Sequence, residues 1–156
     1  MNEDGYDYGP ASFAELLIAR WYPEKTDHET ALLKDYLLAH LQEFDRIRFS
    51  ARVGLGTPVD PTHLPGIQKM TAFSTRNKID MIGWNGRQVT LIEAKKRVGH
   101  AVMGQLLTDR QLWVEEHPDE PEPTLVAIGR ESDDDALRVL TNHGITVYLY
   151  AAPVAE

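Results

Sequence analysis

Apolar side chains recur at helical spacing along several stretches of this chain. The stripe Leu33, Leu37, Leu41 and Phe44 predicts a helix that follows a capping box at Thr26-Asp-His-Glu29. Such a stripe buries one face of a helix against the rest of the protein. Shorter cap and stop signals predict helices over 12–22, ended by Pro23, and over 133–142, ended by Gly144, and a further helix is expected over 100–117.

Strands are predicted where apolar and polar residues alternate, or where short apolar runs lie between turns. Ile47, Phe49, Ala51 and Val53 alternate with polar residues, which predicts a strand over 47–55 with one face inward. Strands over 77–84 and 87–96 flank Asn85-Gly86, and Asn-Gly favours the tight turn of a hairpin. Two more short strands are expected over 124–129 and 145–150.

The predicted elements follow the order α-α-β-loop-β-β-α-β-α-β, with no internal repeat and no domain boundary. We therefore expect one α/β domain over 1–156, with a central mixed β-sheet flanked by helices. Residues 1–10 are predicted to form a flexible arm. Residues 56–75 contain several Gly and Pro and show no clear period, which predicts a long loop.

Three charged residues, Asp80, Glu93 and Lys95, interrupt the apolar pattern of the predicted hairpin and require an explanation. With Asn85 and Gly86 as the turn, Asp80 faces Leu91 across the hairpin. Side chains two residues apart share a face of a sheet, so Asp80, Glu93 and Lys95 lie on one face. Asp80 and Glu93 are then diagonal neighbours, with backbones about 7–8 Å apart.

Two carboxylates at that separation repel each other unless a cation lies between them. Mg²⁺ meets this need, because it takes one or two carboxylates and keeps water and phosphate oxygens as its other ligands. Lys95 would place an ammonium beside the ion, where it can hold an attacking water or offset phosphoryl charge. The alternative is a structural ion pair of Lys95 with Asp80 or Glu93.

Asp80, followed after 12 residues by Glu93-Ala-Lys95, resembles the motif of the PD-(D/E)xK nuclease superfamily, which has the restriction-endonuclease-like fold. The order of elements over 27–129 also resembles the αβββαβ core of that fold. The resemblance implies that Asp80, Glu93 and the Ala94 carbonyl bind metal, and that Lys95 is the catalytic lysine. Position 79 holds Ile where the family motif has Pro.

The resemblance adds two further site residues. A helix before the first core strand often supplies a Glu to the metal site of these nucleases, and Glu29 is the matching residue. Glu29 equally fits the reciprocal half of a capping box with Thr26. The stretch around Gln105 resembles a helix whose Gln orients water or binds phosphate, and the alternative for Gln105 is a solvated helix position.

Composition narrows the classes of protein that remain. The chain has 156 residues, 42% of them apolar and 26% charged, which is ordinary for a soluble globular protein. Without cysteine it has no disulfide framework, thiolate zinc site or cysteine nucleophile. No apolar run approaches the roughly 20 residues of a membrane span. The acidic start lacks signal-peptide features, so we expect a cytoplasmic protein without a membrane partner.

The net charge of -8 argues against a nucleic-acid partner, but the charge is unevenly distributed. Residues 46–97 carry 10 basic and 3 acidic side chains, and both flanks are strongly acidic. An anionic partner would therefore bind the middle third. The residues predicted to contact a nucleic-acid backbone are Arg48, Arg52, Lys69, Arg76, Lys78, Lys96 and Arg97.

The hypothesis from the sequence is a small Mg²⁺-dependent nuclease that hydrolyses phosphodiester bonds of DNA with a metal-activated water. Asp80, Glu93, Lys95, Gln105 and Glu29 would form its site, and Mn²⁺ would substitute for Mg²⁺. RNA is the other substrate that the same residues allow, and the resemblance suggests a homodimer. The alternative function is a catalytically silent nucleic-acid-binding or assembly module with the same fold.

Overall fold

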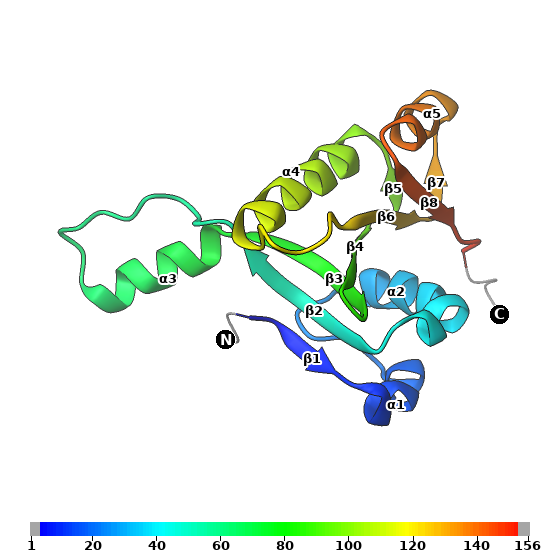
Figure 1. The fold of residues 1–156 in the computed structure, drawn as a ribbon, viewed down its shortest axis with the longest axis horizontal. Coiled ribbons are helices and arrows are strands. Elements are labelled where there is room, and N and C mark those ends of the chain that lie inside the picture. The colour runs from blue at the N-terminus through cyan, green and yellow to red at the C-terminus, as the bar shows by residue number, and fades with distance from the viewer. Residues whose placement is uncertain (1–3, 153–156) are drawn as a thin grey trace.

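Six strands form one mixed sheet in the computed structural model, which describes residues 4–152 (Figure 1). Its strands, in order across the sheet, are β1 (Tyr6–Tyr8), β2 (Arg46–Val53), β3 (Asn77–Asn85), β4 (Gln88–Ala94), β6 (Thr124–Gly129) and β8 (Ile145–Leu149). β1 to β4 are antiparallel, whereas β4, β6 and β8 run parallel. Next to this sheet, β5 (Arg97–Val98) and β7 (Glu131–Ser132) form a short parallel pair.

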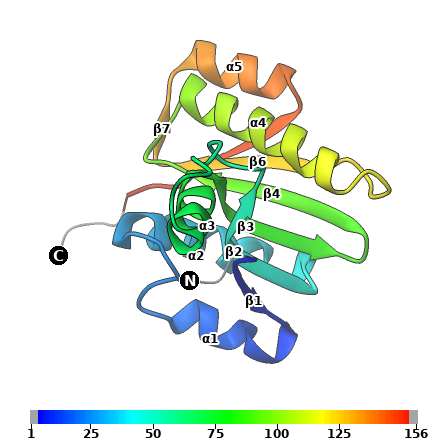
Figure 2. The ribbon, with the colours of Figure 1, turned by 90° about the vertical axis from the view of Figure 1, so that its left-hand side faces the viewer.

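Helices cover both faces of the sheet, as Figure 2 shows. α1 (Phe13–Ile18) and α2 (Asp27–His40) pack on one face, through residues such as Leu16 and Leu33. α4 (His100–Glu116) and α5 (Asp134–Asn142) pack on the other, through residues such as Leu106 and Leu140. Two short 3-10 turns, Pro10–Ser12 and Leu41–Glu43, adjoin α1 and α2. This arrangement confirms the predicted α/β fold with a central mixed sheet flanked by helices. Within residues 4–152 no helix is long and apolar enough to span a membrane.

The predicted capping box begins α2, and a side-chain cap that was not predicted begins α5, whereas Ser12 at the start of α1 makes no side-chain cap hydrogen bond. The Thr26 hydroxyl accepts a hydrogen bond from the Glu29 amide, and the Glu29 side chain accepts one from the Thr26 amide. The Asp133 carboxylate accepts the Ala136 amide and so caps α5. Each cap satisfies N–H groups that have no partner within the helix, which fixes where the helix begins.

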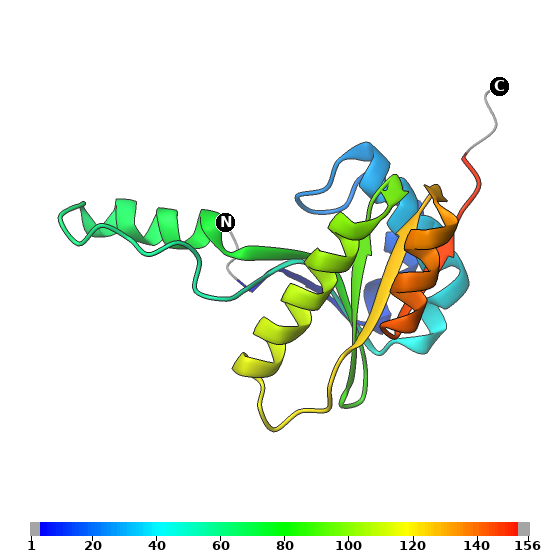
Figure 3. The same ribbon diagram turned by 90° about the horizontal axis from the view of Figure 1, so that it is seen from above.

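Two segments predicted to lack regular structure are partly ordered, so those predictions were wrong. Residues 65–75 of the predicted long loop form a helix, α3 (Pro65–Thr75), with Pro65 at its first position. Figures 1 and 3 show α3 and the loop before it extending away from the sheet. In the predicted flexible arm, Tyr6–Tyr8 form the edge strand β1; residues 1–3 of that arm lie outside the described residues.

The hairpin register differs from the prediction by two residues. Asn85 pairs with Gln88, so the turn consists of Gly86 and Arg87 rather than Asn85 and Gly86. Gly86 has φ +60° whereas Arg87 does not have a positive φ, which is the pattern of a type II′ turn with Gly first. A shift of two residues leaves every side chain on its predicted face. Asp80 and Glu93 therefore share a face of the sheet, as predicted. They are direct neighbours across the hairpin, however, and not the diagonal neighbours that were predicted.

Gly129 tests how tightly β6 packs against the chain that follows β4. A Cβ atom at Gly129 would lie 2.5 Å from the Lys95 carbonyl oxygen and 2.7 Å from a Val98 methyl. We expect Gly129→Ala to lower the free energy of unfolding by about 1–3 kcal/mol, because the backbone has to shift. Gly104→Ala is the matched control, since a Cβ there meets open space. It only reduces the conformational freedom of the unfolded backbone, so it should raise the free energy of unfolding by about 0.5–1 kcal/mol. Urea denaturation checks both, and equal effects would contradict the packing argument.

Candidate active site

Asp80 on β3 and Glu93 on β4 lie directly opposite each other. The last paired residues in this direction are Met81 and Ile92, and Asp80 and Glu93 occupy the next position of the same register. Both lie on the face that packs against α4. Asp80 is 4% exposed, and its Oδ2 accepts the Ala94 amide at 2.9 Å. That hydrogen bond fixes the Asp80 carboxylate at the end of the pairing between β3 and β4.

Glu93 has a buried carboxyl group that lacks a hydrogen-bond partner at Oε2 within residues 4–152. Burial raises the pKa of Glu93 far above its ordinary value, and the negative charges of Asp80 and Asp109 raise it further. Without a bound cation, Glu93 therefore keeps its proton at neutral pH. An orphaned, buried oxygen next to a second carboxylate is the kind of group that a cation satisfies.

Two residues that the sequence reasoning did not single out complete this acidic cluster. The buried Lys25 ammonium lies 2.9 Å from Asp80 Oδ1. Asp109 on α4 is fully buried, and burial is the main cause that raises its pKa to about 7. Asp109 occupies an apolar-stripe position of α4 between Leu106 and Trp113, so this acid at a core position was a readable signal. Lys25 precedes the α2 cap in a polar loop, and its sequence context gives no signal.

Gln105 is half-buried and bound to Asp109, so the alternative of a solvated helix position was wrong. Its Nε2 donates to both carboxylate oxygens of Asp109, at 3.1 and 3.2 Å. These two hydrogen bonds lower the pKa of Asp109, against the larger effect of burial. The predicted role of Gln105 toward water or phosphate stays a prediction.

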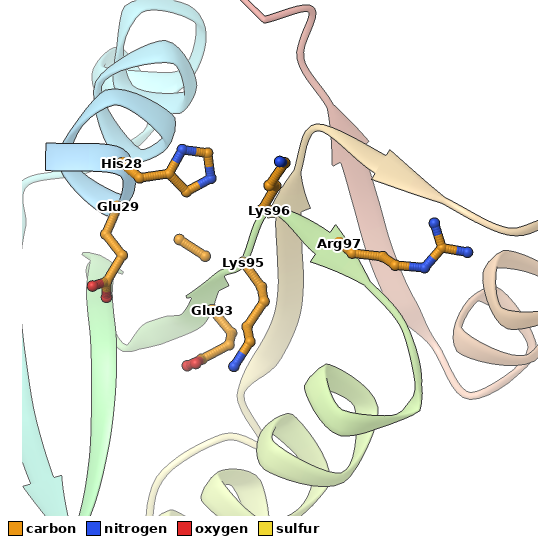
Figure 4. A pocket seen from close by; sticks show the side chains of 7 residues that line it. His28, Glu29, Glu93, Lys95, Lys96 and Arg97 are labelled. Carbon is orange, nitrogen blue, oxygen red and sulfur yellow. The ribbon is translucent and has the colours of Figure 1, made fainter. Parts of the chain in front are cut away.

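A pocket of about 520 Å³ opens beside the carboxylates. Its lining residues are His28, Glu29, Glu93, Ala94, Lys95, Lys96 and Arg97. Figure 4 shows Glu93 and Lys95 extending from neighbouring positions of the chain in the same direction, while Lys96 points the opposite way. Lys95 is exposed at the pocket, so its ammonium can meet a ligand there. No ion pair of Lys95 with Asp80 or Glu93 is found within residues 4–152.

Glu29 takes the capping role that was one of its two predicted roles. Its Oε1 accepts the Thr26 amide and hydroxyl. Its Oε2 lies 4.0 Å from the Lys25 ammonium and the side chain lines the pocket. One carboxylate oxygen thus holds the helix cap while the other faces the acidic cluster, so the capping role leaves room for the predicted role toward a metal.

The predicted nucleic-acid-binding residues do not gather into one surface. Among them, only Lys96 and Arg97 line the pocket. Arg48 pairs with Asp7 at 2.6 Å, and Arg52 pairs with Glu24 at 2.8 Å. Arg97 itself pairs with Asp133 at 3.3 Å.

The remaining basic residues of the predicted set are distributed around the α3 arm. The Arg76 guanidinium donates to the backbone carbonyls of Gly54 and Arg52, so it fixes the base of the arm. Lys69 is part of α3, and Lys78 lies near the start of β3. Arg76 thus has a structural role, which the sequence reasoning did not anticipate.

The donor set at this site consists of two carboxylates and a backbone carbonyl. Within residues 4–152, no group of three or more His, Asp or Glu side chains is arranged to hold a metal ion. Mg²⁺ needs no such group, since it takes one or two carboxylates and completes its shell with water and phosphate oxygens. Asp80, Glu93 and the Ala94 carbonyl therefore fit a hard divalent cation, and the orphaned Glu93 oxygen is the observation behind that fit.

Comparison with known proteins adds structural likeness only. No protein-family model matches the sequence, and no curated protein matches it. The fold is similar to a repair endonuclease from Pyrococcus abyssi, with a TM-score of 0.46 and 14% identity, covering 85% of this chain and 50% of that one. It is also similar to an EndoMS–dsDNA2 complex, with a TM-score of 0.45 and 17% identity, covering 88% of this chain and 51% of that one. The chain spans about half the length of each, and likeness at this level carries no conclusion about function.

Asp109 makes the stability of the metal-free protein depend on pH. Its pKa is near 3.8 in the unfolded chain and about 7 in the folded protein. The folded state therefore binds more protons between these values. The stability conferred by neutral Asp109 is complete below about pH 4 and is lost as the pH rises to about 7.

We expect Asp109→Asn to remove this loss. From pH 4 to pH 7 its free energy of unfolding should rise relative to the wild type by roughly 2–4 kcal/mol. Urea denaturation in the presence of a chelator measures the two profiles. The exposed Asp119→Asn is the control and should follow the wild type; parallel profiles for all three proteins would contradict the prediction.

Proposed function

We propose that the protein is a metal-dependent nuclease of PD-(D/E)xK type that hydrolyses phosphodiester bonds of DNA. The observation that supports this most is the buried pair Asp80 and Glu93, placed face to face on adjacent strands with an unsatisfied oxygen on Glu93. Asp80 is paired with Lys25, but Glu93 Oε2 has no partner among the described residues, and such a buried polar atom is rare in a purely structural site. Lys95, two residues after Glu93, is exposed and lines the pocket, where a phosphate can reach it.

Asp80, Glu93 and the Ala94 carbonyl would hold Mg²⁺, or Mn²⁺ in its place, with Glu29 as a further ligand. When bound, the ion supplies positive charge that stabilises phosphate and lowers the pKa of water. The raised pKa of Glu93 favours its neutral carboxyl group while no ion is bound. Glu93 therefore has to lose its proton before it can serve as a ligand. The Ala94 amide donates to Asp80 Oδ2 and so fixes the carboxylate that would present an oxygen to the ion.

Lys95 would act on the substrate directly. Its ammonium can donate to a phosphate oxygen or hold a water molecule next to the phosphorus, and it offsets the charge that grows in the transition state. Gln105 would act through Asp109, because both of its amide hydrogen bonds go to that carboxylate. Gln105 is therefore a positioning residue of the acidic cluster.

The pocket lining indicates how a nucleic-acid strand would approach. Lys95, Lys96 and Arg97 are consecutive, exposed and cationic at the pocket. Contacts of this kind neutralise backbone phosphates without reading bases. DNA is the proposed substrate and RNA the alternative; the homodimer and the cytoplasmic location stay predictions from the sequence.

Cleavage of plasmid or oligonucleotide DNA with Mg²⁺ or Mn²⁺ tests the proposed activity. Asp80→Ala and Lys95→Ala should each lower the cleavage rate by about 100-fold or more, since the first removes a ligand of the ion and the second removes the ammonium that offsets charge at the reacting phosphate. Arg138→Ala is the control, because Arg138 is exposed on α5 and pairs only with Asp135 among the described residues. Circular dichroism and melting temperature confirm that each variant folds.

Two outcomes of that assay would contradict the proposal. Cleavage that survives both Asp80→Ala and Lys95→Ala would mean that the activity does not come from this site. Absence of cleavage, together with DNA binding and with Mn²⁺ binding no better than in Glu93→Ala, would favour the catalytically silent binding module.

The salt dependence of DNA binding separates pocket cations from internally paired ones. Lys96→Ala should weaken binding and reduce the slope of log K against log salt by about one, because one phosphate contact is lost. Arg48→Ala should change the slope little, since the guanidinium already pairs with Asp7. Fluorescence anisotropy at several salt concentrations measures both slopes, and a larger effect of Arg48→Ala would contradict this assignment of the binding surface.

A further inference from the structure

Lys25 is a buried cation in contact with the proposed metal ligands. Its side chain is 0% exposed, and its ammonium lies 2.9 Å from Asp80 Oδ1 and 4.0 Å from Glu29 Oε2. Fully buried lysines are rare unless they are paired. The ammonium makes no hydrogen bond of regular geometry within residues 4–152, so the ion pair with Asp80 is its main compensation there.

The backbone around Lys25 is firmly held. Its amide donates to the Tyr22 carbonyl at 3.1 Å, and the Pro23 carbonyl accepts the Ser50 hydroxyl at 2.8 Å. Thr26, the next residue, is the N-cap of α2. The side chain is therefore directed toward Asp80 by fixed segments on both sides, and the ammonium can change place only by rotation of its own flexible stem.

The ammonium and a divalent metal compete for the same oxygen atoms. Asp80 Oδ2 is engaged by the Ala94 amide, and Oδ1 by Lys25, so neither oxygen is open to a further cation. Two cations that share one carboxylate oxygen repel strongly in a site shielded from water.

We propose that Lys25 occupies the cation position at Asp80 in the metal-free protein, and that a divalent metal binds only by displacing its ammonium from Asp80. This inference rests on the proposed function. Lys25 thus sets the metal affinity of the site without touching the substrate. It also holds the Asp80 carboxylate in place while no metal is bound.

Calorimetric Mn²⁺ titration of the metal-free protein tests the competition. Lys25→Met should lower the Mn²⁺ dissociation constant at least tenfold, because the competing charge is removed. Lys34→Met is the matched control: it deletes the same charge from α2, where the Lys34 ammonium donates to the Ala19 carbonyl and not to the site. Its dissociation constant should equal that of the wild type. Lys25→Gln serves in place of Lys25→Met if the methionine variant does not fold.

A second measurement uses the wild-type chain alone. Amine acylation followed by mass spectrometry should find Lys25 protected without Mn²⁺ and modified with saturating Mn²⁺, whereas exposed Lys96 reacts in both conditions. Lys25 that stays protected at saturating Mn²⁺ would overturn the inference, as would an unchanged or weaker Mn²⁺ affinity of the Lys25 variants.

DNA cleavage measured on the same preparations distinguishes the two proposals. If the wild type cleaves DNA and loses activity with Asp80→Ala, but the Lys25 variants bind Mn²⁺ no more tightly, the displacement of Lys25 fails and the nuclease stands. If neither the wild type nor the Lys25 variants bind Mn²⁺ and none cleaves, both proposals fail.

Discussion

The ion pair between Lys25 and Asp80 is the interaction on which this end of the sheet depends. One carboxylate joins three segments, because Asp80 on β3 accepts the Ala94 amide of β4 and contacts Lys25 from the loop before α2. Removing one partner of a buried ion pair costs about 3–5 kcal/mol, whereas replacing both with apolar residues is often neutral. Stability alone therefore does not explain why charged residues occupy this place. The cation site proposed beside Asp80 and Glu93 would explain it, because local departures from the rules of core packing are typical of functional sites.

Local signals in the sequence were sufficient for most of the fold and for the pairing of the acids. The capping box of α2 depends on two residues three apart, so it can be recognised without knowledge of the tertiary structure. The shared face of Asp80 and Glu93 follows from the period of two along a strand. That inference tolerated an error of two residues in the register, because only an odd shift moves a side chain to the other face. The turn type itself depended on which residue takes a positive φ, and Asn85-Gly86 did not specify this.

The missed features depend on contacts between distant parts of the chain or on a helix that buries little. Lys25 meets Asp80 across 55 positions of sequence, and nothing next to Lys25 marks it as buried. α3 buries only Phe73 and exposes Ile67 and Met70, so it lacks the apolar face from which helices are usually recognised. Asp109 is different, since its position on the apolar stripe of α4 was visible and its burial followed from that stripe.

Charge counted along the sequence and charge available in space are different quantities in this protein. The middle third has an excess of basic residues, yet Arg48 and Arg52 form ion pairs with acidic residues of the N-terminal part. The field at the pocket is therefore set by a few neighbours: the cations Lys95 and Lys96, and the acidic cluster below them. Before a cation binds, that cluster opposes an approaching phosphate. A divalent ion that binds there weakens this opposition, because it adds two positive charges where Lys25 supplies one. In the proposed nuclease, metal binding and attraction of a polyanion would thus be coupled through the same carboxylates, and an acidic protein would need no large basic surface at this pocket.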